Sequence, residues 1–99
     1  MNKSTSDDIR REMKEADELF KEQLSFSFKL EDSISKSISR ISRAMENCSL
    51  KTSNFEAFKE LKEQYHRDLI DIEDNRIRKQ YENSRRMDEY IQELYRLEK

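Results

Sequence analysis

The stretch ISKSISRISRAMENCSLKTSNFEAFKELKEQYHRDLI (residues 34–70) decides the fold of this chain. Apolar residues on both sides of its middle recur every three or four positions, which is the spacing of one face of an α-helix. The middle, NCSLKTS (residues 47–53), consists mainly of weak helix formers and of residues that cap helices. The pattern predicts two amphipathic helices joined by a short connector.

The ends of both helices carry capping residues. SNFE (residues 53–56) has the form of a capping box, in which the Ser53 hydroxyl and the Glu56 carboxylate each accept a hydrogen bond from the other residue's amide. At the first helix, Ser6 or Asp7 can supply the capping oxygen, and Asp8 suits the positive helix N-terminus. We predict a flexible N-terminus over residues 1–5, helix one over 6–47, a connector over 48–53 and helix two over 54–98.

The composition of the whole chain supports an all-α fold. The sequence has 99 residues, of which 42% are charged, 33% are hydrophobic and none is Gly or Pro. Ala, Glu, Lys, Leu and Arg supply 45 residues, which is close to the share typical of coiled coils. A sheet protein needs glycine in its turns and β-branched residues in its strands. The composition therefore predicts an elongated helical hairpin or coiled coil, which we expect to be oligomeric.

Helix one has an apolar seam with a change of spacing in its middle. Ile9, Met13, Ala16 and Phe20 follow coiled-coil spacing, but Phe20, Leu24 and Phe28 are each four residues apart. Such a passage indicates a stutter, where the supercoil locally unwinds, or a break over residues 25–32. LSFSFKL (residues 24–30) also alternates with period two, as a strand would. A lone strand would have no sheet to join, so helix is favoured.

Helix two has two apolar seams around a polar stretch. Continuing the register of Tyr65, Leu69 and Ile72 places Arg76 and Asn83 at seam positions, where apolar residues would be more stabilising. Polar residues on a seam can select a partner at a cost in stability, so we predict that Arg76 and Asn83 determine specificity. The predicted partner-binding residues on both helices are Ile34, Ile38, Ile41, Met45, Leu61, Tyr65, Leu69, Ile72, Met87, Tyr90, Leu94 and Leu97.

The residues of catalysis and of metal binding are sparse. Without glycine there is no phosphate-cradling loop, and Cys48 has no histidine near it in sequence to act as a base. Glu63 and His66 have the Glu-x-x-His spacing of di-iron bundles, but this is the only histidine of the chain. We predict a protein that is not an enzyme and has no catalytic residues, no cofactor and no metal.

Charge and targeting patterns bear on the partners. The 20 basic and 22 acidic residues give a net charge of −2, whereas proteins that neutralise phosphates usually carry a basic excess. No apolar run approaches the length of a signal-peptide core or of a membrane span, and one cysteine fits a reducing compartment. We therefore expect a cytoplasmic or nuclear protein that is not secreted.

These observations together predict a non-enzymatic coiled-coil scaffold or adaptor subunit of an intracellular multi-protein complex. It would bind protein partners through its helical seams, as a homo- or hetero-oligomer. The alternative is a nucleic-acid-associated helical protein that uses the basic cluster at residues 76–86. Peripheral membrane contact through the apolar edge of helix one is disfavoured, because acidic residues are mixed into its polar face. Phosphorylation of the serines near Ile34 and Ile38 is a further possibility that sequence leaves open.

Overall fold

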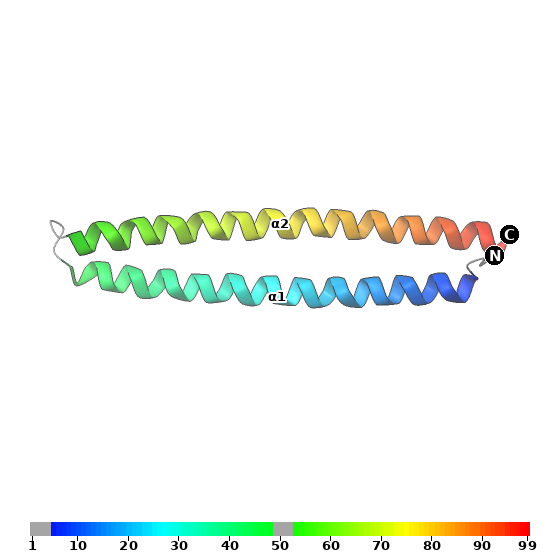
Figure 1. The fold of residues 1–99 in the computed structure, drawn as a ribbon, viewed down its shortest axis with the longest axis horizontal. Helices are drawn as coiled ribbons and strands as arrows, with labels where there is room; N and C mark the ends of the chain where they lie inside the picture. The colour runs from blue at the N-terminus through cyan, green and yellow to red at the C-terminus, as the bar shows by residue number, and fades with distance from the viewer. Residues whose placement is uncertain (1–4, 49–52) are drawn as a thin grey trace. The chain divides into compact units, whose positions relative to one another are not determined.

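The computed structural model describes residues 5–48 and 53–99. Helix α1 spans Ser6–Glu46 and helix α2 spans Ser53–Glu98, and no strand occurs among the described residues (Figure 1). The predicted all-α fold of two long amphipathic helices in a hairpin is confirmed. Residues 25–32, where a break or a strand was considered, are continuous helix.

The chain divides into two compact units. The terminal unit combines Met1–Ser25 with Arg76–Lys99, and the connector unit comprises Phe26–Asn75. In the terminal unit the two helices are antiparallel, because Arg10, near the start of α1, forms an ion pair with Glu98, at the end of α2. The connector unit combines the C-terminal part of α1 with the N-terminal part of α2.

The first turn of α1 is capped by Thr5. The Asp8 amide donates to Thr5 Oγ1 at 3.1 Å, and the Thr5 amide donates to Asp8 Oδ2 at 3.2 Å. This reciprocal pair is a capping box that begins one residue before Ser6, so our assignment of the cap to Ser6 or Asp7 was wrong. Thr5 is favoured as the cap because Asp8 lies three residues after it. At this spacing each residue's side chain accepts a hydrogen bond from the other's amide, so two otherwise unpaired amides are satisfied.

The last turn of α1 tightens before the connector. The amides of Asn47 and Cys48 donate to the carbonyls of Ala44 and Met45, three residues earlier, at 3.2 and 3.1 Å. The Asn47 carboxamide also donates to the Arg43 carbonyl at 3.2 Å. These bonds satisfy carbonyls that a helix leaves open at its C-terminus. The rest of the predicted connector and the Ser53 hydroxyl of the predicted second capping box lie outside the described residues.

Burial along the hairpin is shallow. Among the described residues, the hydrophobic side chains that reach the core are Ile9 in the terminal unit, 6% exposed, and Ile41 in the connector unit, 9% exposed. The remaining apolar seam residues are half-buried, or exposed as Leu61 and Leu97 are. One helix can cover only one side of another, so much of the apolar surface of the hairpin stays open.

Candidate interaction surfaces

Most residues predicted to bind partners lie on the inner face of the hairpin instead of its outside. Within the connector unit Ile41 is buried, and Ile34, Ile38, Met45, Tyr65, Leu69 and Ile72 are half-buried. Met87, Tyr90 and Leu94 are half-buried in the terminal unit, whereas Leu61 and Leu97 are exposed. These stripes are therefore largely occupied by packing within the chain.

The polar stretch of α2 also contains partly buried residues. Arg76, Lys79 and Asn83 are half-buried in the terminal unit, and Arg86 is exposed. Met87 takes the seam position that an uninterrupted register would give to Arg86, because the step from Asn83 to Met87 is four residues. Of the two residues predicted to determine specificity, Asn83 thus faces α1 of the same chain, and Arg76 is half-buried.

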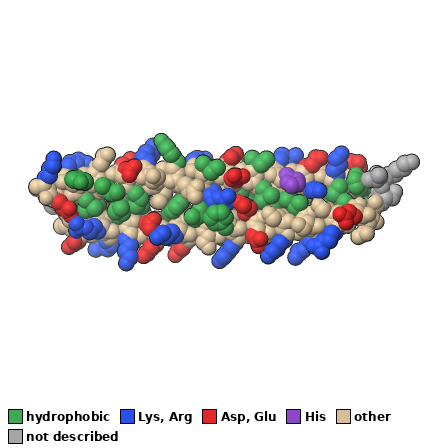
Figure 2. All heavy atoms as spheres, turned by 180° about the vertical axis from the view of Figure 1, so that it is seen from behind, with side chains coloured by type: hydrophobic (Ala, Val, Ile, Leu, Met, Phe, Trp, Pro, Cys, Tyr) green, Lys and Arg blue, Asp and Glu red, His purple; other side chains and the backbone are tan. Residues whose placement is uncertain are grey.

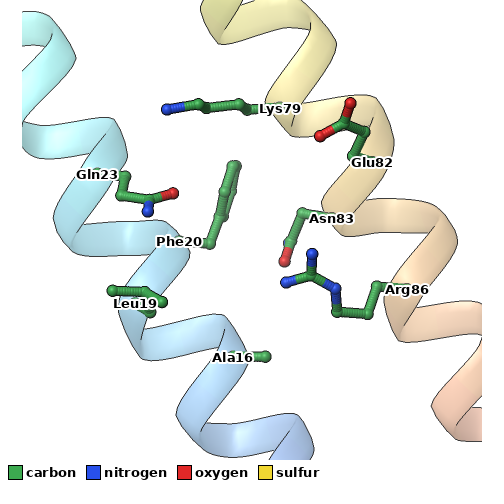
Figure 3. Close-up of a pocket in the computed structure, with 8 residues that line it drawn as sticks. All are labelled: Ala16, Leu19, Phe20, Gln23, Lys79, Glu82, Asn83 and Arg86. Atoms are coloured by element: carbon green, nitrogen blue, oxygen red, sulfur yellow. The ribbon is translucent and has the colours of Figure 1, made fainter.

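A shallow pocket of about 210 Å³ marks the level at which this polar stretch meets α1 (Figure 3). Phe20 extends from α1 toward α2 at the level of Lys79 and Asn83. The residues that line the pocket are Ala16, Leu19, Phe20, Gln23, Lys79, Glu82, Asn83 and Arg86. An aromatic ring on one helix is here set against polar side chains on the other.

The two helices change their spacing at this same level. The half-buried residues of α1 include Ala16, Phe20 and Leu24, each four residues apart, and those of α2 include Lys79, Asn83 and Met87 with the same steps. Two consecutive steps of four locally unwind a supercoil. Both helices line the pocket with residues from these steps, so the two changes of spacing lie at the same level of the terminal unit.

The stutter of α1 differs in detail from the predicted one. After Leu24 the half-buried positions are Ser27 and Glu31, while Phe28 is exposed. The helix is continuous here, so its rotation is set by the apolar residues on either side of this segment. Phe26 and Leu30 are consequently exposed as well, Phe26 by 67%.

Asn83 carries a polar atom that is buried without a partner. Its side-chain oxygen is buried and accepts no hydrogen bond, the single such case among the side chains that the structure describes. Figure 3 shows the Arg86 side chain turned toward the same region. A buried carbonyl oxygen without a donor costs about 1–3 kcal/mol relative to its hydrated state. Position 83 is therefore one where we expect an apolar side chain to be more stabilising than Asn.

Large apolar side chains remain exposed outside the seam on both helices. Figure 2 shows apolar side chains open to solvent between charged ones on the face in view. In the terminal unit they include Ile77, Tyr81, Ile91 and Tyr95 on α2, which are between 43% and 71% exposed. Sequence reasoning missed this set, although their spacing of 4, 10 and 4 residues is that of a second helical stripe.

The residues weighed for chemistry are dispersed. Glu63 and His66 are both exposed on α2, and Cys48 is half-buried just after the end of α1. Within residues 5–48 and 53–99, no group of three or more His, Cys, Asp or Glu side chains is placed to hold a metal ion.

Comparison of the chain with protein-family models, with curated proteins and with solved structures gives no match. Over the described parts of the chain, neither helix contains a segment apolar enough and long enough to cross a membrane.

Proposed function

We propose that this chain is a non-enzymatic coiled-coil scaffold or adaptor subunit of an intracellular multi-protein complex, and that it acts by helix–helix binding. The observation that carries the proposal is the set of large apolar side chains exposed on both helices outside the seam. Burying one such side chain contributes about 1.5–3 kcal/mol, so several together can hold a partner helix. A patch of this kind commonly marks a protein interaction site.

The alternative of nucleic-acid binding is supported less well. It requires the basic cluster at residues 76–86 to be displayed to phosphates, but Arg76 and Lys79 are half-buried in the terminal unit. Arg78, Arg85 and Arg86 remain exposed, with Glu82 among them. Helix pairing is therefore the preferred mode of binding.

The test is recovery of the tagged chain from native cell extract, with mass spectrometry of the bound proteins and light scattering of the purified complex. The variant Phe26→Glu places a charge on the exposed apolar face of α1, and Lys29→Glu is the matched control at an exposed polar position. We expect a partner of fixed stoichiometry that is lost with Phe26→Glu and retained with Lys29→Glu.

Salt separates the two kinds of partner. Phosphate contacts weaken steeply as salt rises, whereas an apolar helix contact responds little. Retention of the protein partner in high salt supports the proposal. Recovery of nucleic acid that is released by salt, or equal behaviour of the two variants, would overturn it.

A further inference from the structure

The residues of the second apolar stripe of α2 are spaced symmetrically about its midpoint. The stripe consists of six exposed positions in the terminal unit: Ile77, Tyr81, Ser84, Asp88, Ile91 and Tyr95. Their spacing is 4, 3, 4, 3 and 4, which reads the same in both directions and is that of a coiled-coil seam. Position 86 is the midpoint of the set.

An antiparallel pair of such helices would bring complementary side chains together. Rotation by 180° about an axis at the level of residue 86 places Ile77 opposite Tyr95 and Tyr81 opposite Ile91 of the other copy. Ser84 then lies opposite Asp88, where a hydroxyl can donate to a carboxylate. Each apolar position meets an apolar position of the other copy, and each of the two central polar positions meets a polar one.

The charges of the same segment are also self-complementary in this arrangement. Residues 76–86 contain five basic residues and one acidic residue, while residues 87–98 contain four acidic residues and one basic residue. An antiparallel pairing sets the basic half of each copy along the acidic half of the other, and a parallel pairing sets like charges together. Complementary charge favours the correct partner and register.

We propose that the occupant of this stripe is a second copy of this chain, bound antiparallel through α2 about a two-fold axis near residue 86. A two-fold contact of this kind uses the same patch on both subunits and closes at two copies. The six positions span about 28 Å of helix, so we expect a small interface with a dissociation constant in the micromolar range. The proposal deepens the proposed function by naming one partner, and it uses a stripe separate from the α1 face tested with Phe26→Glu.

The experiment is sedimentation equilibrium of the full chain from low to high micromolar concentration, with circular dichroism to verify that each variant is helical. We expect a monomer–dimer equilibrium for the wild type. Tyr81→Glu and Ile91→Lys should each raise the dissociation constant of the dimer about a hundredfold. The two-fold axis places each substitution at two sites of the interface, and a loss of about tenfold at each site multiplies to about a hundredfold. Leu19→Glu, which charges a comparably exposed apolar side chain on α1, is the matched control and should leave it unchanged.

Mixing the two variants tests the register. In an antiparallel dimer of one Tyr81→Glu copy and one Ile91→Lys copy, the new charges face each other as an opposite pair and the second contact stays apolar, so the mixture should dimerise more strongly than either variant alone. In a parallel dimer the new charges do not meet, and mixing restores nothing. Three results would each overturn the proposal. The wild-type chain could be monomeric at high micromolar concentration, Leu19→Glu could weaken the dimer as much as Tyr81→Glu does, or the mixture of the two variants could dimerise no more strongly than either variant alone. If the wild type is monomeric while the Phe26-dependent partner is still captured, this proposal fails and the proposed function stands.

Discussion

At the scale of single residues, the N-terminus of α1 depends on one threonine. Thr5 accepts a hydrogen bond from the Asp8 amide and donates its own amide to the Asp8 carboxylate. We expect Thr5→Ala to lower the free energy of unfolding by about 1 kcal/mol, because it removes the capping oxygen. Chemical denaturation monitored by circular dichroism measures this. Ser25→Ala, at an exposed position in the middle of α1, is the control and should cause no loss of stability.

The same cap makes the start of α1 sensitive to acid. Hydrogen bonds from the Thr5 amide and hydroxyl, assisted by Arg11, hold the pKa of Asp8 below its ordinary value of 3.8. A carboxyl group with a lowered pKa contributes stability above its unfolded pKa and loses that contribution as the pH falls through its folded pKa.

We therefore predict that the first turn of α1 frays as the pH falls below about 3.8. NMR titration of the Asp8 carboxyl carbon should give a pKa below that value. In Thr5→Ala the pKa of Asp8 should move back toward it. An unchanged pKa in Thr5→Ala would show that the Thr5 hydroxyl does not contribute to lowering the pKa of Asp8, which would then rest on the residue-5 amide and Arg11.

Asn83 is a polar residue of the seam whose replacement by an apolar residue we expect to stabilise the fold. Its buried side-chain oxygen accepts no hydrogen bond, and the side chain lies at the level of Phe20. We predict that Asn83→Leu raises the free energy of unfolding by about 1 kcal/mol, because it replaces an unsatisfied polar atom with apolar surface. Gln92→Leu, at an exposed position of the same helix, should change it far less. Destabilisation by Asn83→Leu would instead mean that its carboxamide makes an essential contact. The role of Arg76 and Asn83 in partner choice stays a prediction.

At the scale of the helices, stability should follow the seam and not the size of the apolar residue. Ile41 is the most buried of the described side chains in the connector unit, while Phe26 is largely exposed. We expect Ile41→Ala to cost about 2 kcal/mol or more and Phe26→Ala less than about 0.5 kcal/mol, because only the first opens a cavity. Urea unfolding of the two variants gives both values, and equal costs would contradict the assignment of the inner face.

At the scale of the whole molecule, assembly and folding should be linked. If two copies pair through the second stripe of α2, the dimer is favoured at high concentration and unfolding is opposed by mass action. We predict that the Tm of the wild type rises with protein concentration and that the Tm of Tyr81→Glu does not. Thermal unfolding over a hundredfold range of concentration tests this. Identical curves for the wild type throughout that range would show that folding does not depend on self-association.

The amino-acid sequence alone was enough to predict the class of fold. The absence of Gly and Pro removes the common causes of breaks within helices, and the run of weak helix formers at residues 47–53 separates the two apolar patterns. The period of the seam also indicates which residues share a face, because helix geometry relates position to direction. These are local properties, so they can be read from neighbouring residues.

The tertiary structure decided which faces are used within the hairpin. Helix α2 carries two stripes of similar period, and periodicity cannot tell which of them packs against α1 in the same chain. The structure assigns the stripe of Met87, Tyr90 and Leu94 to the inside and leaves Ile77 and Tyr81 exposed. Ser27 and Glu31 are likewise half-buried where Phe26 and Phe28 are exposed. The rotation of a long continuous helix about its axis is set by the packing of all its seam residues together. A short segment therefore keeps that rotation even where it exposes apolar side chains and buries polar ones.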